Sequence, residues 1–304
     1  MTRFGYACIS QLTGLTTNHN CQLKAATPDK LRGLIARNLE DLAAILRHNQ
    51  EHGWRCFRVG SSVIPFGSHP VNTLRWWEEF AEPLAALGRF VLAHGMRLSM
   101  HPGQYTVLNS PNEAVRVSSL AELVYATRFL DALGLDGQHK VVLHIGGVYG
   151  DKPAAAKRFI AAAKTLPDRV RRRLVIEHDE RGYNLAEVVE IAHQTRLPVV
   201  FDHLHDRLYP SLLPARALLP EVFATWKAAD GPPKVHFSSQ AVGGRFGAHA
   251  DMADPVEFRA VLDLCRQFGD FDLMLEAKAK DAALRAVLAA SDVSSYLNLS
   301  HQAG

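Results

Sequence analysis

The sequence predicts a single (β/α)8 TIM barrel, in which eight parallel strands alternate with helices. The chain has 304 residues, and barrels of this kind typically run to about 250. About eight short β-like runs alternate with longer helical patterns, an order that favours parallel strands joined by crossover helices. A doubly wound open sheet is the alternative, but it would normally need fewer units. No glycine-rich dinucleotide-binding motif follows the first strand, which also disfavours it.

The predicted strands are short, and the third shows how they are recognised. Leu98 and Met100 alternate with polar residues, which is the period of a strand, and Pro102 and Gly103 then end it. The eight strands are expected at residues 3–9, 55–60, 97–101, 140–145, 173–177, 198–202, 234–238 and 272–276.

The helices between these strands have recognisable first and last residues. Thr27 is a capping residue that precedes Pro28, a first-turn proline, ahead of a long amphipathic run. Ser110 and Asp254 are each followed three residues later by a glutamate, which is close to a capping box. Three glycines follow helical runs at the position after the expected C-cap: Gly53, Gly95 and Gly134.

The composition indicates a cytoplasmic protein with its own hydrophobic core. Hydrophobic residues make up 47% and charged residues 21% of the chain, which is ordinary for a soluble globular protein. The four cysteines show no C-x-x-C spacing, so we expect free thiols in a reducing compartment. We expect no signal peptide, because the first residues lack a charged segment followed by an apolar one, and no apolar run has the roughly 18–20 residues of a membrane span. The net charge of +3 permits a polyanionic partner without requiring one.

No low-complexity segment or linker divides the chain. We therefore expect one barrel domain over residues 1–280, with residues 281–304 forming the final barrel helix and a C-terminal tail.

Six consecutive predicted strands deliver a histidine or a carboxylate to their C-terminal ends. In a barrel these ends converge on one face, where barrel enzymes build their sites. One such histidine alone is usually an ordinary hydrogen-bonded residue, but a dense group is costly to bury unless a cation shares it. The residues are His101, His144, Glu177, Asp202 with His205 just after it, His236 and Glu276.

This donor set predicts two to three divalent metal ions. Imidazole and carboxylate ligands without a thiolate suit Zn²⁺ or Mn²⁺. Glu177 and Glu276 could bridge a pair of ions. A pair about 3.5–4 Å apart is the standard device for in-line displacement at phosphorus.

For several residues near this set, the sequence allows either a supporting role or metal binding. His178 and His203 are expected to support the ligands rather than to bind metal. The glycine-rich segment 241–249 is either a flexible surface loop or, as we prefer, a loop that returns His249 to the site.

Lys234 lies two residues before His236, so both side chains point to the same side of the strand. An ammonium group beside divalent cations would be repelled. Lys234 is therefore neutral, points away, or has been carboxylated by CO₂. A lysine that extends to solvent is about equally expected from the sequence.

The sequence resembles the UV damage endonuclease family in several motifs. The match is expected from about residue 1 to about residue 280. The motifs are G-Y at 5–6, P-F-x-S-H-P at 65–70, L-S-M-H-P-G-Q-Y at 98–105, L-H-I-G-G, I-E-x-D-E, D-x-L-H, K-V-H-x-S-S-Q and R-x-G-A-H-A. That family is similar in fold to endonuclease IV and xylose isomerase, nicks DNA immediately 5′ to ultraviolet photoproducts, and uses a three-metal cluster generally taken to be manganese.

The resemblance implies a role for particular residues. Tyr6 would lie near the metals and the scissile phosphate, and Lys234 would be carboxylated. Gln104 and Tyr105 match a pair that probes the duplex at the lesion; alternatively, Tyr105 packs against the helix that begins near Ser110. Ser10 stands about where the family has an asparagine that contacts the lesion. The implied metal ligands are His101, His144, Glu177, Asp202, His205, His236, His249 and Glu276.

We therefore expect a metal-dependent endonuclease, probing damaged double-stranded DNA as a monomer and leaving a 3′-hydroxyl and a 5′-phosphate. Glu177 and Lys234 are the expected catalytic residues, and Arg58, Arg207 and Arg245 would contact phosphates. Other helix-distorting or abasic lesions are further candidate substrates. A sugar isomerase or epimerase on the same barrel, and a damage-binding protein without catalysis, are the alternatives.

Overall fold

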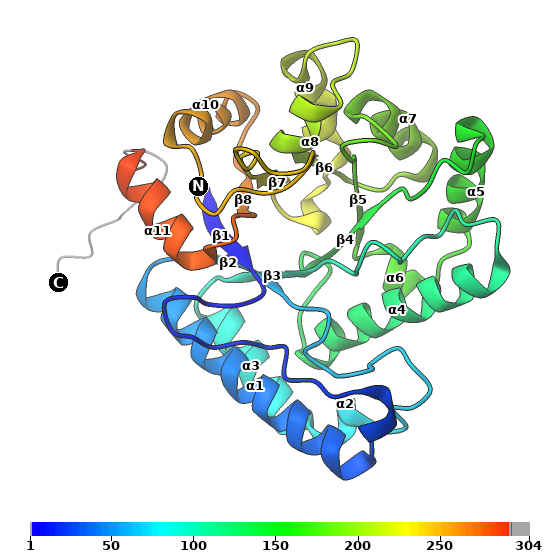
Figure 1. The fold of residues 1–304 in the computed structure, drawn as a ribbon, viewed down its shortest axis with the longest axis vertical. Helices are drawn as coiled ribbons and strands as arrows, with labels where there is room; N and C mark the ends of the chain where they lie inside the picture. Colours follow the sequence, from blue (N-terminus) through cyan, green and yellow to red (C-terminus); the bar gives the residue numbers. More distant parts are fainter. Residues whose placement is uncertain (1, 292, 294–304) are drawn as a thin grey trace.

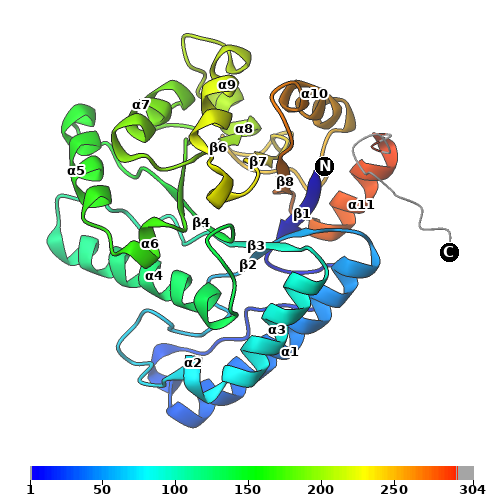
Figure 2. The ribbon, with the colours of Figure 1, turned by 180° about the vertical axis from the view of Figure 1, so that it is seen from behind.

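A computed structural model describes residues 2–291 and 293 and contains a closed eight-stranded barrel (Figures 1 and 2). All strand pairs are parallel and follow the chain order, and the first strand closes the barrel on the last. The predicted (β/α)8 barrel is confirmed, and closure excludes the open sheet. The strands are β1 (Arg3–Ala7), β2 (Cys56–Val59), β3 (Arg97–Met100), β4 (Lys140–His144), β5 (Leu174–Glu177), β6 (Val199–Asp202), β7 (Lys234–Phe237) and β8 (Asp272–Leu275).

Helices form a layer around the barrel (Figure 1). The α-helices are α1 (Pro28–Glu51), α2 (Trp76–Glu79), α3 (Ala81–Ala93), α4 (Glu113–Ala132), α5 (Lys152–Lys164), α6 (Asp168–Arg171), α7 (Leu185–Thr195), α8 (His203–Leu208), α9 (Ala215–Thr225), α10 (Pro255–Arg266) and α11 (Lys280–Ala290), with 3₁₀ turns η1 (Leu23–Ala25) and η2 (Ala228–Asp230).

Several helices begin and end where the local sequence predicts caps. The Thr27 hydroxyl accepts the backbone N–H of Lys30, with Pro28 at the first helical position. Asp254 accepts two backbone N–H groups at the start of α10. The glycines at 53, 95 and 134 all have positive φ angles after helices, as expected for this position.

Two predicted boundaries are wrong by two residues, and the other strand ends differ from the prediction by at most one. Helix α4 is capped by Asn112, whose side chain accepts the N–H of Ala114, whereas the Ser110 hydroxyl accepts the N–H of Asn112 just before the helix. The first strand was expected to reach residue 9 but ends at Ala7, because Cys8 has a φ of 75° and turns the chain.

The barrel interior has a charged layer at the N-terminal ends of the strands. The buried Arg97 donates to Asp272 Oδ2 at 2.5 Å, and Arg3 donates to Asp272 Oδ1 at 3.1 Å. Lys140 donates to Asp230 at 2.6 Å. Branched apolar residues usually fill this space in TIM barrels, so charge pairing replaces part of the apolar packing here.

The final helix belongs to the barrel's helical layer. Asp281, Ala283, Leu284 and Val287 of α11 are buried. The tail predicted after this helix lies in residues 292 and 294–304, outside the described part of the chain. In the described residues no helix is long and apolar enough to cross a membrane.

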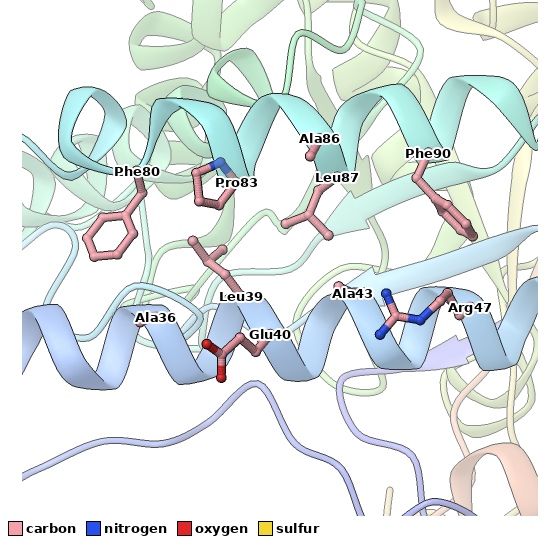
Figure 3. A pocket seen from close by; sticks show the side chains of 10 residues that line it. All are labelled: Ala36, Leu39, Glu40, Ala43, Arg47, Phe80, Pro83, Ala86, Leu87 and Phe90. Atoms are coloured by element: carbon pink, nitrogen blue, oxygen red, sulfur yellow. The ribbon is translucent and has the colours of Figure 1, made fainter.

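Helices α1 and α3 lie side by side on the outer surface and line an apolar groove (Figure 3). Leu39 and Ala43 of α1 face Leu87 and Phe90 of α3. None of the predicted site residues lines this groove, so the chemistry must be sought at the barrel mouth.

Candidate metal and nucleic-acid site

Glu177, at the end of β5, is the centre of the site. Its carboxylate is buried, and Oε2 lies 3.1 Å from His101 Nε2 and 3.6 Å from His144 Nε2. The other oxygen, Oε1, lies 2.7 Å from His236 Nδ1. The ends of strands β3, β4, β5 and β7 therefore bring three imidazoles around one carboxylate, as their positions at the C-terminal ends predicted.

The remaining predicted ligands extend this cluster. Asp202 shares with Glu177 and His236 a group of ligand atoms that all lie within 4.8 Å of one another. Glu276 Oε1 lies 3.2 Å from His236 Nδ1, and Glu276 Oε2 lies 3.8 Å from His249 Nδ1. The structure thus brings the loop histidine His249 back to the barrel mouth, where we preferred to place it.

The charges of the cluster depend on one another. Burial alone would raise the pKa of Glu177, but the imidazoles of His236 and His144 hold it well below its usual range. Burial acts in the same direction on Glu276, and Arg58 lowers the pKa of that carboxyl. For His205, burial lowers the pKa, whereas Asp202, Glu177 and Glu276 raise it to about 9. Glu177 and Glu276 are therefore held ionised, whereas His205 without metal keeps a proton that an ion bound to its ring would displace.

Several buried polar atoms in this group lack a hydrogen-bond partner among the described residues. They include Asp202 Oδ2, His236 Nε2, His144 Nδ1 and Lys234 Nζ. Buried polar atoms in folded proteins are nearly always paired, so unpaired ones at a site call for an ion or an unseen partner. Carboxylate and imidazole donors are the ligands that suit Mn²⁺ and Zn²⁺, so these residues fit a metal centre.

His178 holds two of the candidate ligands in place. Its Nε2 accepts the backbone N–H of Asp202 at 3.0 Å, and its carbonyl oxygen accepts from His205 Nδ1 at 2.9 Å. Because Nδ1 of His205 donates, Nε2 of that ring is free to bind a metal. The supporting role expected for His178 agrees with this geometry, and His203 stacks on Phe237 instead, with 5.3 Å between ring centroids.

Lys234 is buried at the start of β7, and its Nζ has no hydrogen-bond partner in the described part of the chain. The alternative in which this lysine extends to solvent is therefore wrong. Burial lowers the pKa of the ammonium group, and the nearby cations of Arg97 and Arg58 act in the same direction.

Two residues expected at the site lie elsewhere. Tyr6 is buried on the helix side of β1, where its hydroxyl donates to Asn49 Oδ1 at 2.8 Å. Ser10 is only 2% exposed, and its hydroxyl donates to Asp281 on the final helix. Neither the catalytic position of Tyr6 nor the lesion contact of Ser10 is compatible with these positions.

Arg58 also differs from expectation. It points into the barrel and pairs with Glu276 rather than lining a groove for phosphates. Arg207 pairs with Glu257 at the surface. The sequence signal for Arg58 is its position two residues after Cys56 on β2, which places both on the same side of that strand.

Gln104 and Tyr105 form an exposed turn beside the cluster, and we call them the probe turn. Tyr105 is 71% exposed, so the alternative in which it packs against α4 is wrong. The N–H of Thr106 donates to Gly103 O at 2.9 Å and closes the turn. A Cβ at Gly103 would lie 2.5 Å from the Tyr105 ring, so the ring lies over this glycine and would have to move to admit a larger residue.

A cleft of about 470 Å³ opens between the probe turn and the cluster. It is lined by His101 and His144, by Gln104 and by the loop that contains Arg181. The exposed Arg245 lies on the segment that leads to His249. Buried donors, an open cleft and an exposed aromatic residue therefore occur together at one face.

The closed parallel barrel, with histidines and carboxylates at its mouth, places this protein in the class of (β/α)8 barrels. The structure is similar to endonuclease IV from Thermus thermophilus, with a TM-score of 0.55, 19% identity and coverage of 94% of this chain and 98% of that chain. It is also similar to D-psicose 3-epimerase from Clostridium cellulolyticum, with a TM-score of 0.54, 15% identity and coverage of 83% and 92%. At such identities the likeness concerns the fold alone.

A family model, a sequence relative and a solved structure identify the family within this fold. The family model described as UV-endonuclease UvdE matches residues 2–303. A UV DNA damage endonuclease from Clostridium perfringens is 38% identical over 299 residues, 97% of this chain and 72% of the relative. The crystal structure of SacUVDE has a TM-score of 0.90 at 32% identity and covers 98% of this chain and 99% of that one. This chain belongs to the UV-endonuclease UvdE family.

This result confirms the resemblance found in the sequence and corrects its extent. The resemblance was expected to end near residue 280, but the family match continues to residue 303. The final helix is therefore part of what the family shares.

Proposed function

We propose that this protein is a metal-dependent endonuclease that incises DNA immediately 5′ of ultraviolet photoproducts and leaves a 3′-hydroxyl and a 5′-phosphate. The observation that carries the proposal is the Glu177-centred cluster, which opens beside an exposed probe turn in a chain of the UvdE family. A sugar isomerase would need a closed pocket for a small polyol, and the 71% exposure of Tyr105 at the rim does not favour one.

The cluster residues would hold two to three divalent ions, with Mn²⁺ favoured and Zn²⁺ the second candidate. His101, His144 and Glu177 form one candidate group, and Glu177, Asp202 and His236 form another. When bound, such ions polarise a phosphate group and stabilise the charge that develops on its oxygens. The other expected ligands, which flank these groups, are His205, His249 and Glu276.

The chain's own residues would prepare this chemistry. Glu177 belongs to both groups and would bridge them. His178 orients Asp202 and His205, and Arg58 keeps Glu276 ionised. Such supporting contacts typically change metal affinity or activity by about 10- to 100-fold.

Lys234 would complete the site as a carboxylated residue. Its buried amine has a lowered pKa, which favours the neutral form that can react with CO₂. A carbamate would replace a cation with an anion at the side chain, and the unpaired Nζ supports a group that extends beyond the amine.

The probe turn would read the lesion. A photoproduct weakens stacking, so separating the bases there costs less than the few kcal/mol needed in an intact duplex. Gln104 and Tyr105 could enter the resulting gap, and Arg245 would contact a phosphate. The same mechanism extends to other helix-distorting or abasic lesions. We further propose that the protein acts as a monomer in the cytoplasm, in keeping with its four free cysteines.

The test is a short duplex with one cyclobutane pyrimidine dimer, labelled in separate samples at either end of the damaged strand. With Mn²⁺, we expect one cut directly 5′ of the dimer, and a polymerase should extend the new 3′ end. A matched duplex without the dimer should stay intact. Binding without cleavage would identify a non-catalytic damage-binding protein, and a cut elsewhere or an end that cannot be extended would refute the proposed reaction.

A further inference from the structure

The segment between β7 and α10 folds into a tight hairpin over residues 240–249, which we call the β7–α10 hairpin. Gln240 and His249 form an antiparallel bridge, and the N–H of Ala241 donates to Ala248 O at 2.7 Å. The Gln240 side chain also bonds backbone groups on the far side of the loop. The hairpin is thus a closed structural unit, unlike the flexible loop that was the alternative interpretation of its glycines.

The tip of the hairpin is apolar and basic. Val242 is fully exposed and Phe246 is 50% exposed. Arg245 is exposed too, and no ion pair involves its side chain in the described part of the chain. Large exposed apolar side chains grouped with a cation usually mark an interaction surface. The tip of the hairpin therefore presents apolar and basic surface to the surroundings.

The hairpin stands across the site from the probe turn. It begins after β7 and ends at His249, whose Nδ1 lies 3.8 Å from Glu276 Oε2. The probe turn follows β3. In a closed barrel of eight strands in chain order, β3 and β7 are four places apart and so lie on opposite sides (Figure 1). The base of the hairpin and the probe turn therefore lie on opposite sides of the barrel mouth.

Arg181 links the hairpin to the loop that follows Glu177. Its guanidinium carbon lies 5.6 Å from the centre of the Phe246 ring, and a guanidinium N–H donates to the Phe246 carbonyl oxygen at 3.5 Å. Phe246, with Arg181 against its ring and Arg245 next to it in the chain, combines the groups that proteins use on nucleic acids. Apolar wedges enter base steps, aromatic rings stack on bases, and arginines contact phosphates.

We propose that the β7–α10 hairpin is a second DNA-contacting element. Phe246 and Val242 contact the duplex on the side of the lesion opposite the probe turn, and Arg181 and Arg245 contact phosphates there. The inference rests on the proposed function and adds a second DNA contact. With contacts on both sides of the cluster, the duplex would be held with its scissile phosphate over the ligands.

The test compares wild type with the double variant Val242→Ser/Phe246→Ser. Binding is measured by fluorescence anisotropy, with Mn²⁺, on a duplex with one photoproduct and on two shortened duplexes that each lack one arm. The double variant should bind the full duplex about tenfold more weakly, since one stacked base contributes about that much. Removing the arm that the hairpin contacts should lower the affinity of wild type for the duplex and leave the affinity of the double variant unchanged.

The control is Leu92→Ser, which changes an exposed apolar residue on α3, away from the barrel mouth; it should bind as wild type. Bound metal should be the same in all three proteins. If wild type prefers damaged DNA and the double variant binds each of the three duplexes as tightly as wild type does, the inference is wrong and the proposed function stands. A loss of metal in the double variant would also overturn it, because the hairpin would then act through His249. If wild type itself shows no preference for damaged DNA, the proposed function fails.

Discussion

At the scale of single residues, Glu177 connects the two candidate metal groups. Replacing it with glutamine keeps the volume and removes the charge that three imidazoles surround. We predict that Glu177→Gln lowers the nicking rate by more than about 100-fold, since even supporting contacts change activity by up to that factor. Binding of damaged DNA should largely survive, because the probe turn and hairpin are unchanged. Both are measured on the same lesion-bearing duplex.

The matched control is Glu190→Gln on α7, where the carboxylate is 69% exposed and far from the imidazoles of the cluster. It should nick at the wild-type rate. Full activity of Glu177→Gln would remove this carboxylate from the mechanism.

Lys234 makes a separate chemical prediction. If its neutral amine attacks CO₂, a new N–C bond forms and one N–H proton is lost, which leaves a carbamate. Wild-type protein equilibrated with ¹³C-bicarbonate should show a carbamate resonance by NMR. Lys234→Met should lose both the resonance and nicking, whereas Lys278→Met, at an exposed lysine, should keep both. Active wild-type protein without this resonance would end the idea.

Single residues also show where sequence reasoning succeeds and fails. The strand-end ligands could be predicted because the topology of a barrel sends all C-terminal strand ends to one face. Ser10 could not be placed, because its partner Asp281 is 271 residues away in the chain. Tyr6 could not be placed either, because the sequence of β1 does not tell which side of the strand faces the interior.

At the scale of elements, the probe turn is closed by one backbone hydrogen bond and presents two exposed side chains. Stacking on a base contributes about 1–3 kcal/mol, so replacing Gln104 and Tyr105 with alanine should weaken binding of damaged DNA by roughly one to two powers of ten. Because Tyr105 is 71% exposed, the melting temperature should not change. Bound metal should not change either, since neither residue is a candidate ligand.

Cleavage assays below saturation give the decisive comparison for this turn. If the double alanine variant cuts a lesion-bearing duplex as fast as wild type does, the probe role is wrong. A fall in melting temperature would instead indicate that the ring contributes to packing.

The helix caps also show how far local sequence predicts structure. Thr27 and Asp254 cap helices as predicted, because each is followed directly by a proline that starts the helix. Before α4 two candidate caps, Ser110 and Asn112, stand two residues apart, and local sequence does not decide between them.

At the scale of the whole molecule, the barrel could be predicted because its eight strand–helix units repeat along the chain. Its charged interior could not, because Arg97 and Asp272 come from strands far apart in sequence. Removing one partner of a buried ion pair typically costs about 3–5 kcal/mol. We predict that Asp272→Ala lowers the free energy of unfolding in urea by about that much, and Asp29→Ala, at a 96% exposed carboxylate, should not.

The same carboxylate gives a pH dependence. Burial raises the pKa of Asp272, but the guanidinium groups of Arg97 and Arg3 lower it below the unfolded value of about 4. Its stabilising contribution is therefore complete above about pH 4 and is lost as the pH falls further. Wild-type stability should decrease over that range by more than the stability of Asp272→Ala. Equal decreases would show that the pair does not contribute.

Under the proposed function, the clustered donors hold metal ions and the protein cuts irradiated DNA but not intact DNA. The most direct measurement compares nicking of irradiated and unirradiated supercoiled plasmid, each with Mn²⁺ and with a chelator. We predict relaxed plasmid only in the irradiated sample with Mn²⁺. Equal nicking of both plasmids, or undiminished nicking of irradiated plasmid by fully metal-stripped protein in chelator, would contradict the account.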